Sequence, residues 1–368
     1  MIKQPYSKIA LVGDMLGEGG AERVQARLSV FFEEHGVEVH HIIVRDIVAY
    51  EYAGELFNMG KLKNDSNGIL NRFKRFSALK KYLKIHQFDY IIDFRVKNRF
   101  LQEYIIANFI YKAPYIMSIR SFETAYYFPK NSFLARNIYK KAYGLLTVSK
   151  ALEEKLRNIY GYRKLKTIYN PIIPSEIAKK ASGDVPFKFK YVLGIGRMKD
   201  NIKQFDHLIL AFKKAKVASP DCKLVLMGEG PYKEKLERLV RNEGIEDYVL
   251  FLPFQENPFP YLKHAYFTAL TSKNEGFPNA LIESLACETP VVAYDCESGP
   301  NEIILHEHNG LLVKNQDIEA MTTAIGSMFK DDGLYQKCKS NATTSVERFH
   351  LNTIGKEWLD YLKIQTEL

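Results

Sequence analysis

The stretch TSKNEGFPNALIESLACETPVVAYD, residues 271–295, combines a polar loop, an apolar helix and an apolar strand. Pro278 suits the first position of a helix, and Pro290 favours its end. Glu275 is then expected in the loop before this helix, whereas Glu283 lies inside it, past the first turn. The following TPVVAYD is apolar along most of its length, as expected for a strand that helices cover on both faces. A strand that follows a helix in this way predicts a parallel α/β sheet.

The same alternation of strands and helices extends in both directions from this stretch. One series begins at KIALVGDM, and a second begins at KYVLGIGR, with the polar ASGDVPFK between them. We therefore predict an α/β protein with two doubly wound, Rossmann-like domains that face each other across a cleft. The first domain is expected to comprise residues 1–182 and the second residues 183–348.

The 368 residues carry a formal net charge of +9, which is unevenly distributed. Residues 1–182 have a net charge of +13 and the remainder −4. The first half is therefore expected to face an anionic partner, and nucleic acid, anionic lipid and phosphorylated substrates are the candidate classes. Nucleic acid is disfavoured because the sequence lacks the arginine- and aromatic-rich surface motifs of nucleic-acid-binding modules.

The sequence contains no apolar run of about 18 residues that would cross a bilayer, and its start lacks the apolar core of a signal peptide. The four cysteines, Cys222, Cys287, Cys296 and Cys338, show no CxxC spacing. We expect reduced structural thiols in a cytosolic protein, and no metal site.

Doubly wound sheets bind ligands in the turns at the carboxyl ends of their strands. The first such turn, GDMLGEGGAER, places Gly19 and Gly20 before a helix, but Glu22 stands where a dinucleotide fingerprint needs its third glycine. The turn GIGRMKDNIK follows Gly196 with Lys199 at the equivalent place, so it also fails this test. Both turns still offer bare backbone for close approach of a ligand. A plain glycine turn is an equally good explanation of the first.

Two cations, Arg197 and Lys203, bracket the second of these turns. An arginine presents a planar fork to phosphate oxygens and a lysine presents a mobile point charge, although a solvated surface pair would look the same. Glu275 and Glu283 flank the first helical turn, whose free N–H groups suit a phosphate and whose carboxylates suit sugar hydroxyls. A nucleotide-sugar has the matching order of groups, with a diphosphate between the transferred sugar and the ribose. Dipole complementarity for Glu275 and a surface salt bridge for Glu283 are the ordinary alternatives.

The order and spacing of these motifs resemble those of the retaining glycosyltransferases of family 4, which have the GT-B fold of two facing Rossmann-like domains. The resemblance covers almost the whole chain, and the conjunction of motifs is more specific than any one of them. It is carried by GGAER (19–23), VSKALEEKL (148–156), IYNPI (168–172), GIGRMKDNIKQFDHLILAF (194–212), VLMGEGP (225–231), NEGFPNALIESLACETPVVAYD (274–295), GPNEII (299–304) and NGLLV (309–313).

This resemblance implies a role for each matching position. Arg197 and Lys203 would neutralise the donor diphosphate, Glu275 would hold the transferred sugar, and these three form the catalytic set. The tail, residues 349–368, would be a helix that returns to the first domain. No cofactor is implied. The positions implied in donor binding are Gly19, Gly20, Gly196, Gly276, Phe277, Pro278, Asn279 and Glu283.

The acceptor side departs from the family pattern, because Arg120 stands near the place where many members carry a histidine. Arg95, Lys97 and Arg99 follow a predicted strand, and residues 69–86 predict a helix with one strongly basic face. That face consists of Arg72, Lys74, Arg75, Lys80, Lys81 and Lys84. An anionic inner-membrane surface would suit it, and Arg95, Lys97 and Arg99 would then be positioned to contact the diphosphate that joins a lipid to its sugar. An ordinary solvated helix face is the alternative.

The predicted function is therefore the retaining, metal-independent transfer of a hexosyl unit from a nucleoside-diphosphate sugar, with UDP expected by family habit. The expected acceptor is a glycan, either soluble or linked to a polyprenyl diphosphate, in the assembly of a cell-surface polysaccharide. The enzyme would act in the cytoplasm, peripherally on the inner face of the membrane. A nucleotide-sugar epimerase of GT-B shape and a non-catalytic sugar-binding protein are the alternatives from other classes.

Overall fold

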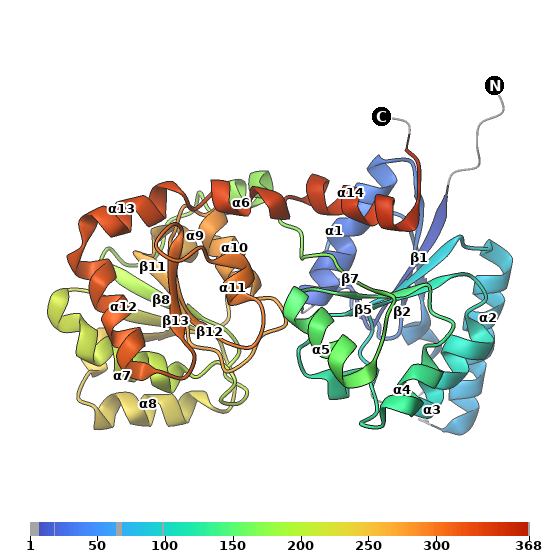
Figure 1. Ribbon diagram of the computed structural model, residues 1–368, viewed down its shortest axis with the longest axis horizontal. Coiled ribbons are helices and arrows are strands. Elements are labelled where there is room, and N and C mark those ends of the chain that lie inside the picture. The colour runs from blue at the N-terminus through green and yellow to red at the C-terminus, as the bar shows by residue number, and fades with distance from the viewer. Residues whose placement is uncertain (1–6, 18, 64–67, 98, 367–368) are drawn as a thin grey trace. The chain divides into compact units, whose positions relative to one another are not determined.

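Two parallel β-sheets divide the chain into two units in the computed structural model, which describes residues 7–17, 19–63, 68–97 and 99–366 (Figure 1). Unit 1 comprises residues 1–171 together with residues 351–368, and unit 2 comprises residues 172–350. The sequence placed the boundary at residue 182. The structure moves it to residue 171 because helix α6 (Pro174–Lys180) packs on helices α9 (Phe259–His264) and α10 (Asn279–Ala286) of unit 2.

The sheet of unit 1 has the strand order β3-β2-β1-β4-β5-β6-β7 within the described residues. Its order reverses between β1 and β4, which is the topological switch point of a doubly wound sheet. The strands are β1 (Lys8–Gly13), β2 (Glu38–Ile43), β3 (Glu55–Asn58), β4 (Tyr90–Asp93), β5 (Tyr115–Ile119), β6 (Gly144–Thr147) and β7 (Leu165–Thr167).

Helices cover both faces of this sheet, with α1 and α14 together on one face and α2 to α5 on the other (Figure 1). They are α1 (Gly20–Glu34), α2 (Ile69–His86), α3 (Phe100–Ile105), α4 (Ser132–Ile138), α5 (Lys150–Tyr160) and α14 (Leu351–Leu362). The shorter helical segments are η1 (Met59–Leu62), the π-helical η2 (Ile106–Ile110) that continues α3, and η3 (Thr124–Tyr126).

The core of unit 1 joins the two ends of the chain. Phe31 and Phe32 of α1 pack in one apolar cluster with Trp358 of α14 and with residues of β1 and β4. Gly355 allows this contact, because a Cβ atom there would lie 2.4 Å from a ring carbon of Phe31. Residues 351–368 are therefore part of unit 1, and the tail helix returns to the first domain.

The sheet of unit 2 has the strand order β10-β9-β8-β11-β12-β13, with its switch point between β8 and β11. Its strands are β8 (Tyr191–Ile195), β9 (Lys223–Met227), β10 (Val249–Leu252), β11 (Phe267–Leu270), β12 (Val291–Asp295) and β13 (Gly310–Lys314). The remaining helices are α7 (Phe205–Ala215), α8 (Lys233–Asn242), α11 (Pro300–Ile303), α12 (Ile318–Lys330) and α13 (Asp332–Ser340). Three short 3-10 segments complete the unit, η4 (Lys216–Ala218), η5 (Glu246–Tyr248) and η6 (Thr344–Phe349).

Edge strand β3 has no counterpart among the strands that the sequence predicts. It is only four residues long, is mostly half-buried and contains no apolar run. The four cysteines are buried free thiols, as expected for structural positions. Among the described residues, every helix is too short or too polar to cross a lipid bilayer.

Candidate active site

The switch point of unit 2 brings together two loops that are distant in sequence. The loop after β8 carries Arg197 and Lys203, and the loop after β11 carries Glu275. Thr271 ties these loops together, because its hydroxyl donates to the carbonyl of Gln204 at 2.8 Å and lies 3.0 Å from that of Lys203. The site therefore stands at the edge of the sheet where doubly wound folds bind ligands.

Lys203 and Glu275 form an ion pair at this point. The Lys203 Nζ donates to Glu275 Oε1 at 2.6 Å, and the Ser272 hydroxyl donates to the same oxygen at 2.6 Å. Only 23% of the lysine side chain and 12% of the glutamate side chain are exposed. The pair therefore fixes the lysine ammonium, and two of its three N–H donors remain for another acceptor.

Arg197 differs from Lys203 in having no counter-charge among the residues that the structure describes. It is exposed, and it forms no hydrogen bond or ion pair with any part of the chain that the structure describes. The backbone around it is held firmly, since the Met198 N–H donates to the Glu229 carbonyl at 2.7 Å. Gly228, with φ 147°, permits this packing, because a Cβ there would lie 2.0 Å from the Gly196 carbonyl oxygen. A free guanidinium on a rigid turn suits an anionic ligand.

The turn before α10 presents backbone rather than side chains. Pro278 is the N-cap residue and α10 begins at Asn279, one position later than predicted. The Gly276 carbonyl accepts a hydrogen bond from the Ser298 hydroxyl at 2.9 Å. The Phe277 ring is 7% exposed and packs edge-on against Phe349, with ring centroids 5.4 Å apart. The Phe277 side chain therefore belongs to the core, and only its backbone can serve a ligand.

Glu283 lies in the second turn of α10 and is 6% exposed. Its neighbours on the same helix, Leu281, Ile282 and Leu285, are fully buried core residues. A carboxylate in this position is costly unless it is hydrogen-bonded or paired. Glu283 therefore lies among core residues and not on an exposed surface.

In unit 1, the residues expected on the acceptor side are engaged in local contacts. Arg120, which follows β5, donates to the Ser118 hydroxyl at 3.2 Å and to the Asn170 side-chain oxygen. Burial lowers the pKa of Arg120 to about 10, so it stays cationic at neutral pH. Gly19 caps the amino end of α1 and Gly20 is the first residue of that helix.

Arg95 and Lys97 belong to a buried ionic cluster around Asp93. Arg95 donates to Asp93 at 2.7 Å and ion-pairs with Glu103 at 3.1 Å. Lys97, fully buried, lies 3.4 Å from Asp93 and donates to the Arg95 carbonyl. Burial would raise the pKa of Asp93, but Arg95 and Lys97 outweigh burial and lower that pKa to about 2. The expectation that Lys97 contacts a ligand is therefore wrong, because its ammonium is enclosed by the protein.

Thr271, Ser272 and Ser298 are site residues that sequence reasoning missed. All three are buried, and each hydroxyl orients a loop or a charged group of the site. Thr271 and Ser272 directly follow β11 in the quoted stretch, so their position at a strand end is a signal that could have identified them.

Two doubly wound sheets, with an arginine that is unpaired among the described residues and a lysine–glutamate pair at the switch point of the second, are the arrangement expected of a glycosyltransferase of the GT-B type. Residues 176–345 match the family described as Glycosyl transferases group 1. The chain belongs to this family.

A relative from Campylobacter jejuni is 33% identical over 358 residues, which cover 94% of this chain and 97% of that protein. It is described as an N-acetylgalactosamine-N,N'-diacetylbacillosaminyl-diphospho-undecaprenol 4-alpha-N-acetylgalactosaminyltransferase. A second protein of that organism, an alpha-1,4-N-acetyl-D-galactosaminyltransferase, is 29% identical, with coverage of 96% and 97%. The solved structure of Anabaena HepE in complex with UDP has the same fold, with a TM-score of 0.76, 20% identity and coverage of 97% and 100%.

Proposed function

We propose that this glycosyltransferase moves a sugar from a UDP-sugar to a saccharide linked to a polyprenyl diphosphate, with retention at the anomeric carbon and without a metal ion. Support for the acceptor comes from the two Campylobacter relatives, whose names specify diphospho-undecaprenol-linked saccharides. The same names make an N-acetylated hexosamine the first donor sugar to test.

The observation that carries this proposal is the charge arrangement at the switch point of unit 2. Arg197 has no partner among the described residues, and Lys203 is held by Glu275 at 2.6 Å with two N–H donors remaining. Two fixed cations can neutralise the negative charge that grows on a departing diphosphate. The positive end of the α10 helix dipole adds a further feature that favours an anion.

In this mechanism the sugar is transferred on one face, and the leaving phosphate accepts the proton of the acceptor hydroxyl. Glu275 would hold the sugar hydroxyls, and Glu283 the ribose hydroxyls. Arg197 and Lys203 replace the charge that a metal ion would supply. Gly19 and Gly20 leave the backbone at the start of α1 bare for close approach to the diphosphate. No side-chain base is required.

The acceptor would bring the protein to the cytoplasmic face of a membrane. Helix α2 carries five exposed basic residues and Phe73, of which 67% is exposed. Arg75 does not belong to this face, because it donates to the Val44 carbonyl at 2.8 Å. An exposed aromatic ring among cations suits an anionic lipid surface. The five basic residues are Arg72, Lys74, Lys80, Lys81 and Lys84.

Product analysis tests the transfer reaction. The protein is incubated with a panel of UDP-sugars and synthetic polyprenyl-diphosphate saccharides, and the products are identified by mass spectrometry and by the anomeric coupling in NMR spectra. An acceptor extended by one sugar with the anomeric configuration of the donor is expected. An inverted linkage, or a sugar epimerised without an acceptor, would contradict the proposal.

Vesicle sedimentation tests the membrane step separately. Binding to vesicles with phosphatidylglycerol is expected to weaken as salt rises, because the Debye length falls to about 10 Å at 0.1 M. Each basic residue near the lipid contributes about 1 kcal/mol. Changing Lys74, Lys80, Lys81 and Lys84 to Gln should therefore abolish sedimentation. Equal sedimentation with neutral vesicles would count against an electrostatic membrane contact.

A further inference from the structure

Unit 1 contains a second cationic site, which is separate from the residues assigned to the donor. A pocket with a cavity volume of about 250 Å³ opens at the carboxyl edge of its sheet, between α2 and α3. Val12, Val44 and Val96 line it and lie at or just after the ends of β1, β2 and β4. The pocket therefore stands beside the switch point of the first sheet, where doubly wound folds bind ligands.

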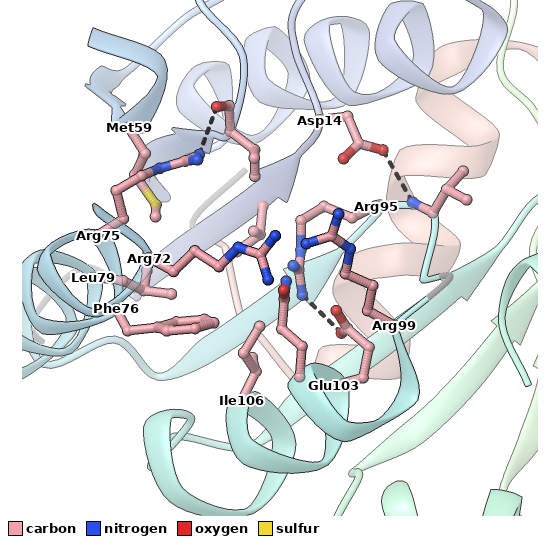
Figure 2. Close-up of a pocket in the computed structure, with 14 residues that line it drawn as sticks. Asp14, Met59, Arg72, Arg75, Phe76, Leu79, Arg95, Arg99, Glu103 and Ile106 are labelled. Atoms are coloured by element: carbon pink, nitrogen blue, oxygen red, sulfur yellow. Dashed lines mark hydrogen bonds and ion pairs between the residues drawn. The ribbon is translucent and has the colours of Figure 1, made fainter. Parts of the chain in front are cut away.

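Four arginines line this pocket and approach one another from three elements. Arg72 and Arg75 come from α2, Arg95 follows β4, and Arg99 precedes α3. Figure 2 shows the side chains of Arg72 and Arg99 extending toward Arg95. Like charges gathered in this way repel one another, and a bound anion would relieve that repulsion. Arginine is also the residue whose planar fork matches phosphate oxygens.

Among the described residues, the carboxylates of the pocket pair with only one of these arginines. Asp14 accepts the Val96 N–H at 3.0 Å, and Glu103 ion-pairs with Arg95 at 3.1 Å. Arg95 also forms an ion pair with Asp93, so the positive charge of Arg95 is compensated within the protein. Its role is to shape the floor of the pocket.

The other three arginines keep free donors. Arg72 and Arg99 are exposed, and their guanidinium groups make no ion pair or hydrogen bond within the described residues. One guanidinium nitrogen of Arg75 donates a hydrogen bond to the Val44 carbonyl, and the Arg75 Nε is buried without an acceptor. A buried donor without a partner is costly, and an anion in the pocket offers the missing acceptor.

The remaining wall of the pocket is apolar. Met59, Phe76, Leu79 and Ile106 line it, and Phe73 and Phe109 are exposed on the adjoining α2 and η2. An anion site beside an apolar wall suits a ligand that joins a phosphate group to a hydrocarbon chain. A free nucleotide has no such chain.

We propose that this pocket binds the diphosphate of a polyprenyl-diphosphate-linked acceptor through Arg72, Arg75 and Arg99. The proposal rests on the proposed function for the identity of the acceptor. It assigns the two diphosphates of the reaction to different units, the donor's to unit 2 and the acceptor's to unit 1.

Calorimetry with farnesyl diphosphate tests the pocket without requiring sugar transfer. The intact protein is titrated with farnesyl diphosphate, inorganic diphosphate, farnesol and UDP. Arg72→Ala and Arg99→Ala should each weaken farnesyl diphosphate binding about tenfold or more, since hydrogen bonds to charged groups are the stronger class. Both residues are exposed, so folding should survive. UDP affinity should not change in either variant.

Matched controls separate this pocket from general surface charge. Lys61→Ala and Lys112→Ala remove exposed cations of unit 1 that do not line the pocket, and farnesyl diphosphate affinity should not change. Equal losses of farnesyl diphosphate affinity in the lysine and arginine variants would overturn the proposal. Displacement of farnesyl diphosphate by UDP would also overturn it, because the ligand would then occupy the donor site. If phosphatidylglycerol vesicles displace farnesyl diphosphate and UDP does not, the pocket binds bulk lipid headgroups, and the proposal of an acceptor site is rejected.

Activity measurements then separate this inference from the proposed function. In the Arg72→Ala and Arg99→Ala enzymes, the KM for a lipid-linked acceptor should rise about tenfold or more while the KM for the donor stays constant. A protein that binds farnesyl diphosphate through these arginines but transfers no sugar would contradict the function and retain the pocket. Transfer to lipid-linked acceptors with an unchanged acceptor KM would contradict the pocket and retain the function.

Discussion

At the scale of single residues, the site of unit 2 depends on which charges are paired. Lys203 is compensated by Glu275, whereas Arg197 makes no ion pair within the described chain. The unpaired guanidinium and the two remaining ammonium N–H donors are thus available to a ligand without breaking an existing contact.

Removing either cation should slow transfer. We expect Arg197→Ala and Lys203→Ala each to lower kcat by about 10²–10³, the usual effect of losing one preorganised electrostatic contact. Lys199→Ala removes an exposed cation of the same loop and should change kcat little. Initial rates are measured with and without EDTA, and activity should persist in the chelator. Activity that requires added Mg²⁺ or Mn²⁺ would contradict a metal-independent mechanism.

The two glutamates should separate donor binding from transfer. Glu283→Gln is expected to weaken UDP binding about tenfold, because it would remove the charge from the proposed ribose contact. Glu275→Ala should not weaken UDP binding, since it leaves Lys203 without its counter-charge, but it should greatly reduce transfer. Calorimetry with UDP alone distinguishes them. Similar losses of UDP affinity in both variants would show that the roles are assigned wrongly.

At the scale of elements, buried polar side chains hold the strands of unit 1 to their helices. His41 on β2 contacts the Gln25 amide of α1 at 3.0 Å and lies 3.2 Å from the Ala53 carbonyl. Burial lowers the pKa of His41 from 6.5 to about 4. The folded state therefore holds this imidazole neutral under conditions in which the unfolded chain would protonate it.

This difference predicts a pH dependence of stability. Between pH 6.5 and 4 the unfolded chain binds more protons at His41 than the folded chain, so stability is lost as pH falls through this window. Between pH 7 and 5 the loss from this residue should be about 2 kcal/mol. Urea unfolding followed by fluorescence of Trp358, the single tryptophan, measures it in unit 1. His41→Gln should reduce the loss by this amount, and an unchanged pH dependence would contradict the assignment.

At the scale of the whole molecule, unit 1 is built from both ends of the chain. Trp358, Leu359 and Leu362 of α14 are buried in the same cluster as Phe31 of α1. The chain therefore completes the core of unit 1 only after unit 2 has been traversed, and a contact between α1 and α14 couples the two ends of the chain.

This packing reverses the usual effect of replacing a helical glycine. Gly355→Ala should destabilise unit 1 by about 1–3 kcal/mol, because the added Cβ would lie 2.4 Å from the Phe31 ring. Gly326→Ala in α12 is the matched control, since a Cβ there meets nothing within 4 Å. It should stabilise unit 2 by about 0.5–1 kcal/mol. Urea unfolding followed by Trp358 fluorescence and far-UV circular dichroism measures both, and stabilisation by Gly355→Ala would contradict the close packing.

The sequence by itself determined the two doubly wound sheets and the helix over residues 69–86, which matches α2. These features follow from local periodicity and from turn residues at strand ends, which neighbours in the chain specify. The glutamates and cations of unit 2 could be chosen as candidates for the same reason. Family resemblance supplied their proposed roles.

Only the tertiary structure decided which charged side chains are free. Lys203 and Glu275 are 72 residues apart, yet they form one ion pair, and Lys97 is enclosed by Asp93 and the Arg95 carbonyl. The boundary at residue 171 likewise depends on the contacts of α6 with α9 and α10. Burial and charge pairing arise between segments that are distant in sequence, so no local pattern of residue types specifies them.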